Sequence, residues 1–191
     1  KYAINFINFY LNNLKNYKKI GSVSAFSYLD NYNSQKKIKY YLSKRHSSWA
    51  WGTWSNVWKK IKWNSLNYKK RNKFSDLGKD MNLMLWAQTN NYINSWAIRF
   101  NYFCFLNNLK SFQPRYSMIN NIGIDGSGTH GFARFKNSEK KFKNRKIKFV
   151  DKILLYSEYN KIDNFIKLKH RKSFRLIFLF LIYYLMNFLK R

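Results

Sequence analysis

Residues 2–27, YAINFINFYLNNLKNYKKIGSVSAFS, join two different sequence patterns that together indicate the fold class. The first part carries apolar residues at helical spacing, namely Tyr2, Ile4, Phe6, Ile7, Tyr10, Leu11 and Leu14. The second part, IGSVSAFS at 20–27, places small and β-branched residues between polar breakers, which is typical of a short buried strand. A helix that leads directly into a buried strand predicts an α/β fold.

The middle of the chain is expected to alternate between loops and helices. Residues 30–45 are polar and basic, and we interpret them as a loop or lid. The tryptophan-rich segment that follows predicts a helix beginning near Trp51, with Ser47 or Ser48 as its cap. Apolar residues at helical spacing predict one or two further helices within residues 80–110.

The last part of the chain changes character twice. Residues 112–122 predict an extended segment that leads into a glycine-rich loop, GIDGSGTHG at 123–131, and a basic linker follows at 136–148. Leu176–Met186 is an unbroken apolar run between basic residues. A membrane-spanning helix needs roughly 20 apolar residues, so this shorter run favours a helix at an anionic membrane surface. A C-terminal helix packed on the domain is the alternative.

The charge of the chain is strongly positive, with 37 Lys and Arg against 8 Asp and Glu, a formal net charge of +29. Such a charge attracts nucleic acid, anionic lipid headgroups or sugar phosphates, although a coding bias toward Asn and Lys explains part of it equally well. The 46% hydrophobic and 20% aromatic content excludes a disordered chain. The single Cys104 excludes an internal disulfide and favours a reducing, cytoplasmic setting.

The N-terminus resembles the interior of a domain. It begins with Lys1 and shows neither a long apolar run nor a small-residue cleavage site, so no signal peptide is predicted. We expect the chain to be a fragment of a longer protein or a truncated gene product.

Three segments carry the candidate chemistry: SSWAWGTWSNVWKKIKW at 47–63, NSWAIRF at 94–100 and NNIGIDGSGTHGFARF at 120–135. Glycines let backbone N–H groups approach a phosphate closely, and the hydroxyl and imidazole groups of the third segment add donors. The sequence contains no two-histidine metal helix, no CxxC pair and no P-loop. Its three histidines lie far apart and are expected to be structural.

In this order and at these gaps, the three segments resemble bacterial family 2 glycosyltransferases of the GT-A fold. More remotely, they are similar to the eukaryotic N-acetylglucosaminyltransferase I group. The resemblance covers residues 1–135 and implies the C-terminal half of a Rossmann-like GT-A domain, with the nucleotide-binding half upstream of Lys1. Residues 136–191 would then form the basic linker and an amphipathic, apolar membrane-surface helix.

The function that this resemblance implies is transfer of a sugar from a nucleotide-sugar to a lipid-linked or cell-surface polysaccharide acceptor. The enzyme would act in the cytoplasm, peripheral to the inner face of the cell membrane. The complete family enzyme is expected to use Mg²⁺ or Mn²⁺, which neutralises the leaving diphosphate. Its acidic metal motif would lie upstream of Lys1, and the aspartates of this chain all stand singly.

The resemblance also assigns site residues. The loop would close over the donor diphosphate through Asp125, Gly126, Ser127, Gly128, Thr129 and His130. Trp49, Trp51 and Trp54 would form the floor under the sugars, although core packing explains any one of them equally well. Arg99 would hold the base segment or a phosphate, with a surface salt bridge as the alternative.

Position 94 departs from the family pattern. The family has its general base, an aspartate, two residues before the tryptophan of the second segment, and this chain has Asn94 there. A neutral amide does not take a proton from a hydroxyl. Asp80 and Asp125 are the alternative bases, but neither has the matching spacing. A non-catalytic copy of the same fold is therefore a second hypothesis.

An RNA-binding protein of ribosomal type is the third hypothesis. The net charge of +29, with interleaved Tyr, Phe and Trp, suits neutralisation of a phosphate backbone together with stacking of bases. No RNP, KH or zinc signature accompanies it.

Overall fold

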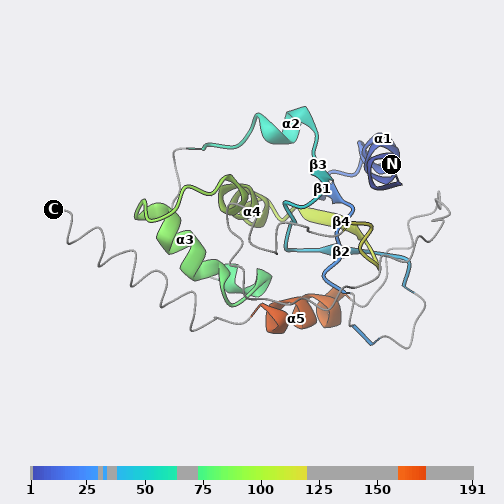
Figure 1. Ribbon diagram of the computed structural model, residues 1–191. Coiled ribbons are helices and arrows are strands. Elements are labelled where there is room, and N and C mark those ends of the chain that lie inside the picture. Colours follow the sequence, from blue (N-terminus) through green and yellow to red (C-terminus); the bar gives the residue numbers. More distant parts are fainter. Residues whose placement is uncertain (1, 30–31, 34–37, 64–72, 120–158, 171–191) are drawn as a thin grey trace.

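The computed structural model describes residues 2–29, 32–33, 38–63, 73–119 and 159–170, and the structural statements below concern this part of the chain. Figure 1 shows its helices and strands. In chain order they are α1 (Tyr2–Leu14), β1 (Ile20–Ser24), β2 (Tyr40–Ser43), β3 (Trp51–Gly52), α2 (Ser55–Trp58), the 3₁₀ helix η2 (Phe74–Leu77), α3 (Met81–Thr89), α4 (Trp96–Leu106), β4 (Lys110–Pro114) and α5 (Tyr159–Lys169). The predicted α/β class is confirmed.

The strands form one mixed sheet in the order β2-β4-β1-β3. The central pair, β1 and β4, is parallel, with Val23 opposite Phe112. The connection between these two strands contains α3 and α4. The outer strands run antiparallel to their neighbours, β3 to β1 and β2 to β4. A parallel central pair with a helical crossover is consistent with part of a Rossmann-like fold.

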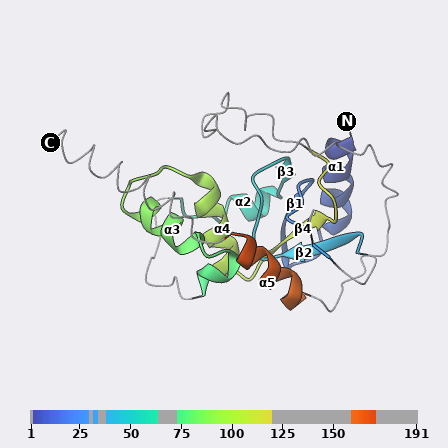
Figure 2. The ribbon, with the colours of Figure 1, turned by 60° about the horizontal axis from the view of Figure 1, so that its bottom comes forward.

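One face of the sheet is covered by α1, and α3 and α4 lie on the other side (Figures 1 and 2). The apolar spacing of α1 places Phe6, Tyr10 and Leu14 in the core. Tyr10 packs against Phe112 of β4, with 4.5 Å between ring centroids. Gly52 of β3 allows α1 to approach closely, because a Cβ at this position would lie 2.8 Å from Leu11 Cδ1.

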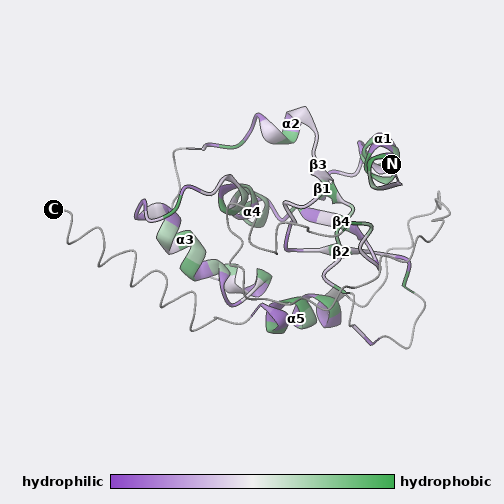
Figure 3. Cartoon of the chain, viewed as in Figure 1, coloured by the Kyte–Doolittle hydropathy of each residue, from purple (hydrophilic) through white to green (hydrophobic). Residues whose placement is uncertain are grey.

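The last described helix, α5, packs against β2 and η2. Apolar and polar residues alternate around it (Figure 3), and its buried Ile162 and Ile166 contact the cluster that contains Leu29 and Tyr41. Asp163 is also buried, and it accepts a hydrogen bond of 3.2 Å from the backbone N–H of Lys44. The predicted division at residue 135 falls among residues that are not described. Beyond it, α5 is part of the packed body.

Several local predictions are confirmed. The helix over residues 2–14, the buried strand that begins at residue 20 and two helices within 80–110 are all present. The extended segment predicted from residue 112 begins slightly earlier, at Lys110, as β4.

Two local predictions are wrong. Residues 30–45, predicted as a loop or lid, include strand β2. No helix begins near Trp51, because Trp51 and Gly52 pair with β1 and α2 begins at Ser55. Ala50 has a left-handed backbone with φ of 39°, which interrupts a helix at this point. Ser47 accepts a hydrogen bond from the backbone N–H of Trp49, so it closes a turn.

Candidate functional site

Aromatic rings from three parts of the chain form a half-exposed surface, which we call the aromatic platform; its residues are Trp51, Trp58, Trp63, Trp96 and Phe100. Trp51 and Trp96 are stacked, with centroids 5.2 Å apart and planes 16° apart. The ring centroid of Trp58 lies 4.5 Å from that of Trp63 and 6.3 Å from that of Trp96. Phe100 supports the rings from below, 4.8 Å from Trp51, and is itself buried. Trp58 and Trp96 remain 38% and 41% exposed.

The start of α4 determines the position of Trp96. Ser95 has an extended backbone and caps the helix, because its side chain accepts a hydrogen bond of 3.4 Å from the Ile98 N–H. The Ser95 N–H in turn donates to Gln88 Oε1 at 2.6 Å. Trp96 is therefore the first residue of a helix whose start is anchored to α3.

The carboxyl end of β1 contacts both the strand that carries Trp51 and the chain that leads into the glycine-rich loop. Trp51 pairs with Ser24, the last residue of β1. The next residue, Ala25, donates its N–H to the Ala50 carbonyl at 2.8 Å and accepts from the Met118 N–H at 2.9 Å. The chain that leads into the glycine-rich loop therefore returns to the strand end that also holds Trp51. The loop residues Asp125, Gly126, Ser127, Gly128, Thr129 and His130 lie outside the described part.

The other two predicted floor tryptophans differ from Trp51. Trp49 is 38% exposed and packs edge-on against Phe26, with centroids 4.8 Å apart. Trp54 faces the opposite way: its Nε1 donates to the Leu11 carbonyl of α1 at 2.9 Å, and its ring packs against the core under α1. Core packing, the alternative for any one of these residues, is therefore the arrangement found for Trp54.

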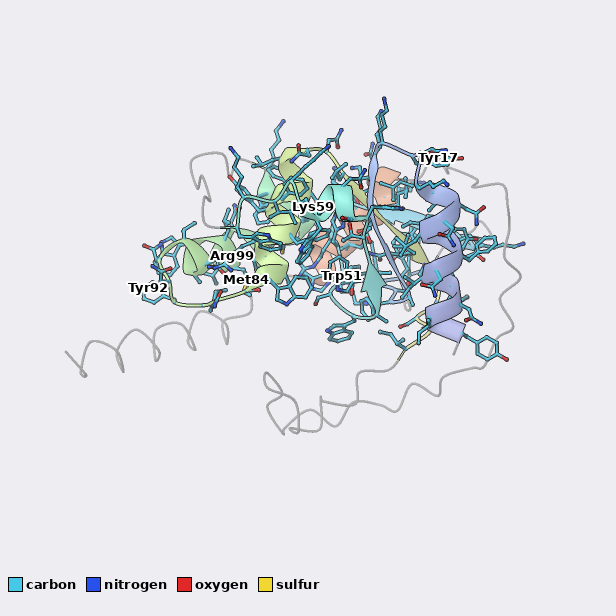
Figure 4. All side chains as sticks on the ribbon, turned by 90° about the horizontal axis from the view of Figure 1, so that it is seen from above. Tyr17, Trp51, Lys59, Met84, Tyr92 and Arg99 are labelled. Atoms are coloured by element: carbon cyan, nitrogen blue, oxygen red, sulfur yellow. The ribbon has the colours of Figure 1, made fainter. Side chains whose placement is uncertain are left out.

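The two predicted polar site residues lie at the start of α4. Asn94 is exposed and directly precedes the cap. Arg99 is half-buried, and within the described part its Nε is buried without a hydrogen-bond partner. A surface salt bridge, the alternative role for Arg99, is not among the ion pairs of the described residues. Figure 4 shows Arg99 and Trp51 among the surrounding side chains.

Asp80, one of the two alternative bases, is held in an ion pair with Arg45. Its two carboxylate oxygens accept hydrogen bonds from the Arg45 guanidinium at 2.8 and 2.9 Å. A bidentate, largely buried ion pair of this kind stabilises the carboxylate and holds it away from solvent. The other alternative, Asp125, lies outside the described residues.

A buried polar network fixes the segment that leads to the platform. His46 Nδ1 lies 2.7 Å from Ser22 Oγ, and His46 Nε2 lies 3.3 Å from the Leu109 carbonyl. Asn101 accepts from the His46 N–H at 2.9 Å and donates to the His46 carbonyl at 3.2 Å. Burial lowers the pKa of His46 to about 4, with the nearby charge of Lys110 acting in the same direction. His46 is therefore a neutral, structural histidine, as expected for an isolated one.

The sequence pattern did not predict this buried polar network. Serines at alternate positions of a buried strand, Ser22 and Ser24, are the one signal that polar partners lie beneath it. Ser22 bonds to His46 and Ser111, and His46 bonds to Asn101. These residues are too far apart along the chain to be paired by spacing.

The described residues do not supply a divalent metal site. No group of three or more His, Cys, Asp or Glu side chains gathers within this part of the chain. Its aspartates are engaged in ion pairs: Asp76 with Lys167, Asp80 with Arg45 and Asp163 with Lys44.

Comparison with known proteins gives no match to a protein-family model, a curated protein or a solved structure. The family resemblance therefore depends on the residues of the three segments. Among the described helices, none has the length and apolar content needed to cross a membrane.

Proposed function

We propose that this chain is the acceptor-binding, C-terminal part of a GT-A glycosyltransferase. It would transfer a sugar from a nucleotide-sugar to a glycan or lipid-linked acceptor at the inner face of the cell membrane. The observation that carries the proposal is that two of the candidate segments, and the residues leading into the third, meet at the carboxyl end of β1. Trp51 of the first stacks on Trp96 of the second, and Met118, just before the third, bonds to Ala25.

The position of the platform supports a binding role. In α/β sheets, ligands bind outside the carboxyl ends of parallel strands, and β1 and β4 are the parallel pair here. The broad indole faces of Trp58 and Trp96 are partly exposed. Such faces pack well against the apolar C–H face of a pyranose ring, while the sugar hydroxyls remain free for hydrogen bonds.

The chemistry of transfer needs more than this platform. The acceptor hydroxyl attacks the anomeric carbon, the bond to the diphosphate breaks, and the hydroxyl proton must pass to a base. Asn94 is exposed beside Trp96 in the sequence and presents an amide, which can orient a hydroxyl but does not take its proton. The donor diphosphate and its Mg²⁺ or Mn²⁺ would need ligands other than the described residues, which contain no cluster of metal-ligating side chains.

The test is a sugar-transfer assay on the complete reading frame of the gene, including any sequence encoded before Lys1. A panel of nucleotide-sugars is supplied with lipid-linked acceptors, and wild type is compared with Asn94→Asp. Restoring the carboxylate is expected to raise the rate about 100-fold or more, the usual contribution of a positioned general base. Absence of transfer by both proteins would reject the proposal.

A matched pair of tryptophan variants accompanies this assay. Trp96→Ala removes half of the stacked pair and is expected to raise the acceptor KM. Trp86→Ala removes an indole of similar exposure on α3, which contacts Tyr92, and should leave the acceptor KM unchanged. Equal effects of the two variants would argue against an acceptor role for the platform.

A further inference from the structure

The aromatic platform carries exposed positive charge. Lys59 and Lys60 directly follow Trp58, and Lys62 directly precedes Trp63. All of these lysines are exposed, and none forms an ion pair within the described part of the chain. In Figure 4, Lys59 lies on the side of the molecule that carries α2.

Acidic residues are absent from the sequence that builds this surface. Neither residues 31–75 nor residues 81–124 contain an Asp or a Glu, and these ranges include β3, α2 and α4. The described aspartates are neutralised by cations elsewhere: two of their ion pairs, Asp76–Lys167 and Asp163–Lys44, involve α5. α5 lies on the opposite side of the molecule from α2 (Figure 1). These carboxylates therefore do not neutralise the positive charge of the lysines next to the platform.

We infer that the aromatic platform binds an acidic glycan, with pyranose rings on Trp58 and Trp96 and the anionic groups of the glycan beside Lys59, Lys60 and Lys62. The inference rests on the proposed function, since it takes the platform as the acceptor site. It adds the chemical class of that acceptor. Because the platform residues carry no carboxylate, the negative charge that pairs with these lysines is expected to come from the ligand.

The arrangement of the rings favours a glycan over single-stranded nucleic acid. Bases bind by stacking on individually available aromatic faces. Trp51 and Trp96 already stack on each other at 16°, so no base can enter between them. What remains available is a surface of two directions, because the ring of Trp58 is tilted by 44° from that of Trp51 and by 59° from that of Trp96. A surface of this kind suits consecutive sugar rings.

The size of the charge effect follows from the exposure of the lysines. Each exposed ion pair contributes about 0.2–1 kcal/mol at low salt, so three lysines together are expected to favour an acidic glycan by about tenfold. Because these charges are exposed, the preference should weaken strongly as the ionic strength rises from about 0.05 to about 0.5 M.

The experiment compares two ligands with the same sugar backbone, one carrying carboxylates and the other neutral hydroxymethyl groups in their place. The full chain is titrated with a galacturonic acid oligomer and with the same oligomer after reduction of its carboxyl groups, and binding is followed by calorimetry. We expect the acidic oligomer to bind about tenfold more tightly at low salt. The double variant Lys59→Ala/Lys60→Ala should lose most of this preference and keep its affinity for the neutral oligomer.

The control double variant is Lys15→Ala/Lys18→Ala, which removes the same charge from exposed positions just after α1 and should behave as wild type. Trp58→Ala should weaken binding of both oligomers. Equal affinity for the two oligomers in wild type would overturn the acidic-glycan inference and leave the proposed function standing. Binding of neither would count against both. A single-stranded RNA that binds more tightly than the acidic oligomer, and depends on Trp58, would replace the glycan with nucleic acid.

Discussion

Acidification is expected to destabilise this fold through one buried histidine. The pKa of His46 is 6.5 in an unfolded chain, and burial lowers it to about 4 in the folded one. Between these values the unfolded chain binds a proton that the folded chain does not, so stability is complete above about pH 6.5 and falls as the pH drops toward 4. Between about pH 7 and about pH 5, the loss from His46 is about 2 kcal/mol.

The assay is urea unfolding followed by tryptophan fluorescence at the two pH values. His170 contributes a loss of the same sign, because burial lowers its pKa to about 4 as well. The comparison with His46→Gln therefore isolates His46. We expect this variant to be less stable than wild type at about pH 7, since Ser22 loses a partner. On moving to pH 5, however, it should lose about 2 kcal/mol less than wild type.

The control variant is His170→Gln, which should keep the His46 part of the acid sensitivity. Identical losses between the two pH values for wild type and His46→Gln would exclude His46 as a source of the acid sensitivity. They would show that the imidazole is protonated at no cost in the folded chain, and hence that it does not lie buried between Ser22 and Leu109.

Two further predictions concern stability at neutral pH. Gly78→Ala should cost about 2–4 kcal/mol in unfolding free energy, because a Cβ there collides with the Arg45 guanidinium and the backbone φ is +156°; a melting temperature equal to that of wild type would contradict this. Trp54→Phe should cost about 1–2 kcal/mol by leaving the Leu11 carbonyl without its indole donor. Trp86→Phe, at an exposed position, should be nearly neutral, and an equal loss in the two variants would contradict the packing role of Trp54.

The elements that were predicted from sequence are those in which burial follows a simple period. In α1, Phe6, Tyr10 and Leu14 repeat every four residues and all face the sheet. β1 is buried along its whole length, so its small and β-branched residues form a continuous run that indicates a strand.

The two strands that were not predicted, β2 and β3, show no clear apolar period in the sequence. In β2 the buried positions are Tyr41 and Ser43, so a polar residue occupies one of the inward positions, and the flanking lysines make the segment appear to be a loop. β3 is only Trp51–Gly52. Its strand character comes from pairing with β1 and from the close approach of α1 to Gly52. Long-range contacts of this kind are not encoded in local spacing.

The candidate site was predicted in part for a related reason. The motif around Trp51 and Trp96 was identified by resemblance, and the structure places these two rings together. Resemblance did not distinguish Trp54, which faces α1, from Trp58, which joins the platform. The direction of each side chain depends on where α2 begins, and the sequence placed that start several residues too early.

Glycan binding by the aromatic platform can be observed residue by residue in an NMR titration of the seven tryptophan indole N–H signals with the galacturonic acid oligomer. We expect the signals of Trp58 and Trp96 to shift most, that of Trp51 to follow because its ring stacks on Trp96, and those of Trp86 and Trp54 to stay in place. Shifts spread evenly over all indoles, or confined to Trp86, would contradict this expectation.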